Sequence, residues 1–171
     1  MDAPSYYSCQ LRLDGRDWYV IWRSDDVDEC VRRSDGRLIV TSTAEQLDDL
    51  CRVLGVQLED GSPTAFDFDQ IRNWCESPNC AGVDCKAFLN AWNFLDDLAG
   101  FYAGADTPFT RLSRAASGVN ETLFWGNNLP VVTPPGEHFV PRWSAEALEA
   151  MRAVFVAGIA LLDAELGERP G

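Results

Sequence analysis

The sequence predicts an α+β fold, with an N-terminal antiparallel β-meander, helices packed on one face of it, and a mainly helical C-terminal half. Runs of β-forming residues separated by Asp-Gly pairs are confined to the first forty positions. Apolar residues at helical spacing, most runs preceded by a capping residue, dominate the rest of the chain. Strands and helices that are segregated along a sequence in this way are typical of α+β proteins.

The meander begins with a strand over residues 6–13, which ends at Asp14-Gly15, a dipeptide that favours a tight hairpin turn. The return strand, Trp18–Trp22, is rich in aromatic and β-branched residues. A second Asp-Gly pair at 35–36 separates residues 31–33 from residues 38–40. Both faces of Trp18–Trp22 are apolar, so this strand is either covered on both sides or carries an exposed binding face.

A helix is expected after the meander. Residues 42–45, Ser-Thr-Ala-Glu, match a capping box that begins at Ser42, and apolar residues recur at helical spacing as far as Leu54. Gly55 is expected to end this helix. Residues 56–58 could form another short strand before the turn that follows.

Four further helices are predicted from their caps. Asp67 or Asp69 would cap a short helix over residues 71–75, and Asp84 a longer one that reaches about Tyr102. Thr107, followed by Pro108 at the first helical position, would begin a third that ends near Ala116.

The last helix is expected to begin at Ser144 and to end at Gly167. Residues 123–135, with three prolines, are predicted to be a loop. The core face of the last helix is expected to comprise Leu148, Met151, Phe155, Ile159, Leu162 and Leu166.

A length of 171 residues fits a single domain over residues 1–171, with a weak subdivision between residues 1–60 and residues 64–171. No signal peptide is visible, and the longest weakly polar stretch, Ala153–Ala164, is too short to span a bilayer. We therefore expect a cytoplasmic protein with reduced cysteines. The sequence contains neither a Walker A loop nor a dinucleotide fingerprint, so no cofactor is expected.

The charge balance is the most unusual feature of the composition. The chain has 27 acidic and 14 basic residues, a net charge of −13, and residues 1–100 hold 19 of the acids but only 9 of the bases. A field of this sign repels nucleic acids and anionic lipids and attracts basic proteins. Acidity alone also serves solubility. We expect a basic protein partner, no direct contact with nucleic acid or membrane, and a monomer.

Catalytic signals are weak. His138 is the single histidine, and no cysteine lies in a catalytic signature. Asp67 and Asp69 form the best carboxylate pair, but capping and the helix dipole favour acids at the same positions. We expect no enzyme, and the alternative is an unfamiliar active site formed by Asp67, Asp69, Cys75 and His138.

Three cysteines, Cys75, Cys80 and Cys85, follow one another at equal spacing. Structural zinc usually takes four ligands, often in closer pairs, so these residues either bind a metal with a more distant fourth ligand or are simply buried thiols. We expect no metal.

The acidic segment 25–29 follows Trp18, Tyr19 and Trp22 directly. Carboxylates that surround aromatic anchors suit a surface that binds a basic partner. Asp96 and Asp97 lie just off the apolar stripe of their predicted helix, and should face solvent. The residues predicted to contact the partner are Trp22, Asp25, Asp26, Asp28, Glu29, Asp96 and Asp97.

Several short stretches, residues 21–26, 66–69, 89–98 and 123–130, together resemble the small cytosolic immunity proteins of bacterial polymorphic-toxin and contact-dependent inhibition systems. The resemblance implies a protein that binds and neutralises a cognate toxin domain, many of which are basic nucleases. It implies no role for any individual residue. The alternative from the charge pattern is another acidic inhibitor, of phage or host origin, that mimics nucleic acid and acts on a different basic protein.

Overall fold

The computed structural model describes residues 3–102 and 106–167, and these residues divide into two compact units. Unit one runs as far as Asp69 and resumes at Leu162; unit two comprises Gln70–Leu161. The strands are β1 (Ser5–Leu13), β2 (Arg16–Ser24), β3 (Glu29–Cys30), β4 (Val40–Thr41) and β5 (Thr64–Asp67). The helices are α1 (Ala44–Leu54), α2 (Phe68–Glu76), the 3-10 turn η1 (Cys80–Gly82), α3 (Cys85–Gly100), α4 (Pro108–Ala115), α5 (Ser117–Gly126) and α6 (Ala145–Gly167).

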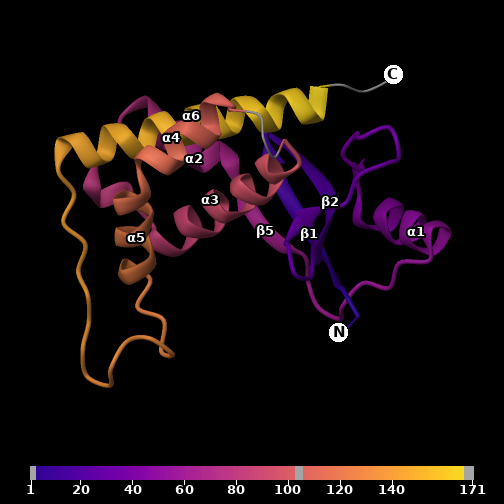
Figure 1. The fold of residues 1–171 in the computed structure, drawn as a ribbon, viewed down its shortest axis with the longest axis horizontal. Helices are drawn as coiled ribbons and strands as arrows, with labels where there is room; N and C mark the ends of the chain where they lie inside the picture. Colours follow the sequence, from indigo (N-terminus) through magenta and orange to yellow (C-terminus); the bar gives the residue numbers. More distant parts are fainter. Residues whose placement is uncertain (1–2, 103–105, 168–171) are drawn as a thin grey trace. The chain divides into compact units, whose positions relative to one another are not determined.

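This architecture confirms the α+β class and the helical C-terminal half (Figure 1). The sheet has the strand order β3-β2-β1-β5, and β4 also pairs with β2. β1, β2, β3 and β4 pair antiparallel, as expected of a meander, but β5 runs parallel to β1, so the sheet is mixed. In the part of the chain that is described, no helix combines the length and hydrophobicity needed to cross a bilayer.

The β1–β2 hairpin turns at Asp14-Gly15, as predicted. Both residues have positive φ angles, 53° and 67°, which suit the tight turns that match strand twist. The Asp69 carboxylate accepts hydrogen bonds from the backbone N–H groups of Asp14 and Gly15, each at 2.8 Å. Of the two predicted caps, Asp69 is excluded, because it lies in the first turn of α2 and binds the hairpin turn instead, whereas Asp67 directly precedes the helix.

The two faces of β2 are both covered at its centre. Val20 and Ile21 are adjacent, so their side chains point to opposite faces, and both have zero solvent exposure. Ile21 packs with Ile39, Leu47 and Cys51 in a core to which α1 contributes (Figure 1). Of the two alternatives from the sequence, the covered strand is therefore correct at the centre of β2, whereas Trp22 near its end is only half-buried.

Helix α1 begins one residue later than the capping box predicts. Its N-cap is Thr43, whose Oγ1 accepts from the Gln46 N–H, and the Gln46 Oε1 accepts from both the N–H and the hydroxyl of Ser42. Ser42 is thus not the cap. The reciprocal bonds of a capping box are present, but between residues 42–43 and Gln46 rather than between Ser42 and Glu45. Gly55 ends the helix in the left-handed conformation, as expected.

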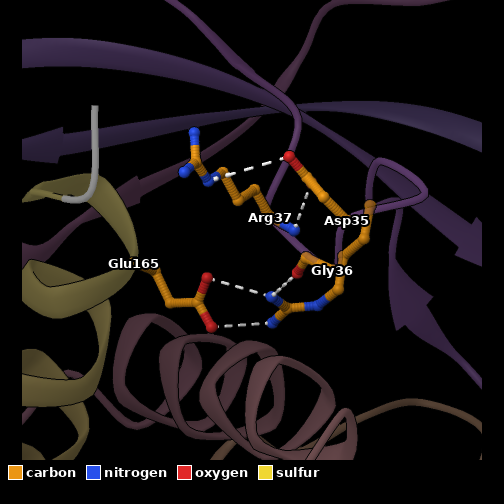
Figure 2. Close-up of polar contacts among 5 residues, drawn as sticks. Asp35, Gly36, Arg37 and Glu165 are labelled. Carbon is orange, nitrogen blue, oxygen red and sulfur yellow. Dashed lines mark hydrogen bonds and ion pairs between the residues drawn. The ribbon is translucent and has the colours of Figure 1, made fainter. Parts of the chain in front are cut away.

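A buried ion pair closes unit one. Arg32 donates from Nη1 and Nη2 to the two carboxylate oxygens of Glu165, both at 2.9 Å, and from Nη1 to the Gly36 carbonyl at 3.0 Å. Figure 2 shows Glu165 pointing at this guanidinium beside the Asp35-Gly36-Arg37 turn. The Arg32 and Glu165 side chains are only 9% and 6% exposed. The pair therefore joins the last turn of α6 to the turn before β4.

Unit two confirms three of the predicted caps. Asp84 accepts from the N–H groups of Lys86 and Ala87, Thr107 accepts from the Thr110 N–H ahead of α4, and the Ser144 hydroxyl accepts from the Ala147 N–H. The predicted loop over residues 123–135 is wrong at its start, because Leu123–Gly126 belong to α5. No side chain caps the beginning of α5, which follows α4 almost without a break.

The core of unit two is aromatic. Phe155 of α6 meets the rings of Phe88 and Trp92 edge-to-face, and Phe88 meets Trp74 in the same way, with centroids 5.1–5.8 Å apart. Such edge-to-face pairs stabilise a core beyond simple burial. Gly158 allows the close packing next to them, since a Cβ there would lie 2.5 Å from Leu95 Cδ1.

We expect Glu165→Gln to destabilise unit one strongly, since the guanidinium of Arg32 would stay buried without its full charge partner. The loss in free energy of unfolding should be about 3 kcal/mol, measured by urea denaturation. The matched control is Glu149→Gln, which breaks the exposed Arg152–Glu149 pair and should cost less than about 1 kcal/mol. Equal losses for the two variants would show that the buried Arg32–Glu165 pair stabilises unit one no more than an exposed pair does.

Candidate partner-binding site

The acidic segment of the sequence forms the connection between β2 and β3. Residues 25–28 leave β2 after Ser24, and the chain returns to pair with β2 at Glu29 and Cys30. All five residues from Asp25 to Glu29 are exposed, and Val27 at the tip is 73% exposed. The predicted binding loop is therefore a short connection held at both ends by the sheet.

Arg23 organises this loop. Its Nη2 donates to Asp25 Oδ2 at 2.9 Å and its Nη1 lies 3.0 Å from Glu29 Oε1. On the neighbouring side chain, the Ser24 hydroxyl donates to Asp28 Oδ1 at 2.9 Å. Three of the four carboxylates are thus held in place, which lowers the entropy that the loop would lose on binding.

The charge of the loop is well defined. The backbone N–H of Asp26 and, second, the Arg23 guanidinium hold the pKa of the Asp25 carboxyl below its usual value of 3.8. The same hydrogen bond to Asp25 raises the pKa of Arg23. The Asp25 carboxylate and the Arg23 guanidinium therefore stay ionised together at neutral pH. With four acidic side chains between residues 25 and 29, the loop is a negatively charged surface.

Trp22 lies on the opposite face of the sheet from Arg23, because successive side chains of a strand alternate. Its ring contacts that of Tyr7, directly across the β1–β2 ladder, with the centroids 5.5 Å apart. Tyr7 is 37% exposed and Trp22 is half-buried. The sheet thus presents an accessible aromatic pair beside the start of the acidic loop.

The other two predicted contact residues, Asp96 and Asp97, lie on α3 in unit two, whereas the acidic loop belongs to unit one. Asp96 is exposed, as predicted, and its Oδ1 accepts from the Ser113 hydroxyl at 3.0 Å. That hydroxyl accepts in turn from the indole N–H of Trp92. Partial burial of the carboxyl raises the pKa of Asp96. Asp97 is half-buried, which differs from the solvent-facing position expected.

The residues of the alternative active site are divided between the units, with Asp67 and Asp69 in unit one and Cys75 and His138 in unit two. Both oxygens of Asp69 already accept hydrogen bonds from the hairpin turn. Burial raises the pKa of the Cys75 thiol to about 11, which makes it a poor nucleophile at neutral pH. His138 lines a cavity to which none of the other three contributes.

The evenly spaced cysteines differ in their surroundings. Cys75 is buried, Cys80 is exposed on η1, and Cys85 at the start of α3 is half-buried. The described residues contain no group of three or more His, Cys, Asp or Glu side chains that could hold a metal ion.

A second exposed surface, which was not predicted from the sequence, lies on the chain between α5 and α6. After α5 this segment extends away from the helices before it reaches α6 (Figure 1). Prolines on either side of Val131 and Val132 were its only signal in the sequence. With Trp125 in the last turn of α5, the segment presents a group of exposed large apolar side chains: Leu129, Val131, Val132, Phe139 and Val140.

Comparisons with known proteins add no assignment, since the chain matches no family model, no curated protein and no solved structure.

Arg23→Gln should raise the pKa of the Asp25 carboxyl toward its usual value but not fully to it, because the backbone N–H of Asp26 still donates to the carboxylate. Carbon-13 NMR titration of the aspartate side chains measures this shift. In the wild type, a pKa of Asp25 at or above 3.8 would contradict the observed loop geometry.

The pKa of the Asp96 carboxyl is raised, whereas that of Asp25 is lowered, so its effect on stability has the opposite pH dependence. A carboxyl whose pKa is raised on folding binds its proton more readily in the folded state, so stability falls as pH rises through the folded pKa. Asp96→Asn removes this penalty and keeps an acceptor for Ser113, so the variant should be at least as stable as wild type at pH 7. We expect any advantage to shrink toward pH 4. Ser113→Ala, which removes the hydrogen bond that lowers the pKa, should raise that pKa further in an NMR titration; an unchanged value would count against this account.

Proposed function

We propose that this protein is a non-enzymatic binding protein whose acidic loop, Asp25–Glu29, and adjacent Tyr7–Trp22 pair contact a basic protein partner. The observation that carries the proposal is the loop itself: four carboxylates, all exposed, with three of them held by Arg23 and Ser24. Single exposed ion pairs occur elsewhere in the chain, as between Arg52 and Asp49, but here three carboxylates of one short loop are held together. A fixed negative loop suits the recognition of a fixed positive surface.

The aromatic pair supplies the second part of the interface. Charged contacts at the rim of an interface mainly speed association and select partners, whereas aromatic residues near its centre provide most of the affinity. Trp and Tyr are enriched among such anchors, and Tyr7 and Trp22 are both accessible without being fully exposed. A partner would thus meet charge along the loop and apolar surface on the adjoining face of the sheet.

The partner that fits best is a toxin domain, most simply a basic nuclease, for which this protein is the immunity protein. Support comes from the net charge of −13 and from the resemblance of short stretches to immunity proteins. An inhibitor that shares the cytoplasm with its toxin also gains from electrostatic steering, because capture must be faster than damage. The other candidate, an acidic inhibitor of a phage or host protein, shares the charge but would have a different gene neighbourhood.

The test is binding of the toxin domain encoded beside this gene, measured by stopped-flow and by calorimetry at several salt concentrations. Neutralising the loop with Asp26→Asn, Asp28→Asn and Glu29→Gln should slow association about tenfold and reduce its salt dependence. The matched control neutralises three exposed acids on or near the first turns of α1, Glu45, Asp48 and Asp49, so that net charge is equal.

The control variant should associate at a rate within about threefold of wild type, since only the general field changes. Equal effects of the loop and control variants would show that the loop is not the contact surface. If the adjacent genes encode no toxin domain, and the protein captures no basic protein, the immunity assignment fails.

A further inference from the structure

Unit two contains a cavity that the acidic loop does not share. Its volume is about 350 Å³, within the usual range of sites for small ligands and side chains. Two aromatic residues, Trp125 and Phe139, line it together with Glu137 and His138. The remaining lining residues are Val132, Thr133 and Pro134.

The walls of this cavity are held by hydrogen bonds within the segment. The Asn128 side chain joins two parts of the segment: its Nδ2 donates to the Phe139 carbonyl at 3.0 Å and its Oδ1 accepts from the Phe139 N–H at 2.7 Å. The Glu137 N–H donates to the Pro134 carbonyl at 3.0 Å across a turn with Gly136 at φ 85°. Proline and these bonds pre-organise the cavity, so little order has to be created on binding.

Close packing against Gly126 fixes the later part of the segment, at Pro141. A Cβ on Gly126, the last residue of α5, would lie 2.5 Å from Pro141 Cγ and 2.6 Å from Cys85 Sγ. Only glycine therefore allows the chain after Phe139 to return against the ends of α5 and α3. This contact keeps Trp125 and Phe139 beside the same cavity.

The chemistry of the lining selects a cation. The face of a Trp or Phe ring attracts an organic cation, and a carboxylate beside the ring supplies the opposite charge. In the described part of the chain, the Glu137 carboxylate makes no hydrogen bond or ion pair of its own, unlike the carboxylates of Asp69 and Glu165. A negative group next to aromatic rings in a chain of net charge −13 favours a positive occupant over a neutral or negative one.

We propose that this cavity, which we name the Trp125–Glu137 pocket, binds an arginine side chain of the protein's partner. A guanidinium is planar, stacks on aromatic rings, is only weakly hydrated, and can donate two hydrogen bonds to one carboxylate. A lysine ammonium is more strongly hydrated and should bind more weakly. The exposed Leu129, Val131 and Val140 nearby offer apolar surface to the chain that carries the arginine.

This inference deepens the proposed function, on which it rests only for the identity of the partner. The pocket lies in unit two, while the acidic loop and Trp22 lie in unit one. The two surfaces differ in kind: the acidic loop attracts a basic protein by its charge, and the pocket accepts a single side chain.

The test uses a small probe, so that it does not depend on finding the partner. The probe is N-acetyl-arginine methylamide, titrated into the full-length protein while the indole N–H of Trp125 and the ring protons of His138 are followed by NMR. We expect saturable shifts at both residues. The corresponding citrulline derivative has nearly the same shape without the charge, and should give at least fivefold weaker binding.

Two variants locate the site. Glu137→Gln should weaken binding of the arginine probe about two- to fivefold and leave binding of the citrulline probe unchanged. Trp125→Leu should weaken binding of the arginine probe by a similar factor. Asp48→Asn on α1, which removes one exposed charge from unit one, is the matched control and should leave binding of the arginine probe unchanged.

Equal binding of the arginine and citrulline probes, or no saturable shift at Trp125, would overturn the pocket assignment. These outcomes are distinct from failure of the proposed function. Arginine binding at Trp125 without any basic protein partner would leave the pocket standing and remove the immunity role. Partner binding that depends on the acidic loop, with no arginine binding at Trp125, would support the proposed function and remove the pocket assignment.

Discussion

The β1–β2 hairpin is the element on which unit one depends. Every other strand of the sheet pairs with one of its two strands, and the residues at the centre of β2 are covered on both faces. Its turn is fixed by the Asp69 carboxylate, and its open end carries the acidic loop. Because Trp22 and Arg23 occupy consecutive positions of β2, the pairing register also decides which face receives the aromatic pair and which receives the guanidinium.

The acids of this chain serve two different purposes. Asp69 and Glu165 are used within the fold, where each accepts two hydrogen bonds from other parts of unit one. Asp26 is exposed in the acidic loop, and Glu137 is exposed and lines a cavity together with Trp125 and Phe139. An overall surplus of acid therefore does not by itself identify a binding surface. The distinction comes from exposure: the loop carboxylates stay accessible to a partner even where Arg23 and Ser24 hold them, whereas the Glu165 side chain is buried against Arg32.

Local signals in the sequence were sufficient wherever a cap and its backbone donor are close neighbours, as at Asp84, Thr107 and Ser144. The Asp14-Gly15 turn and the acidic loop could be located for the same reason. Non-local features could not be predicted: the parallel pairing of β5 with β1, the bond from Asp69 to the hairpin, and the contact of Trp22 with Tyr7 all depend on register. Helix α5 was not predicted, since no side chain caps it. The Trp125–Glu137 pocket was not predicted either, since it forms only where Trp125 of α5 meets a later part of the chain.

The Arg32–Glu165 pair has a consequence for the order of events during synthesis. Its partners are 133 positions apart, so the arginine leaves the ribosome long before its carboxylate exists. Until the last turn of α6 is made, the N-terminal sheet holds a guanidinium that must stay hydrated. Contacts of such long sequence separation slow folding, and incomplete sheets expose strand edges meanwhile. Nascent chains of this protein should therefore complete their N-terminal unit only after Glu165 has emerged, and should need protection from premature association until then.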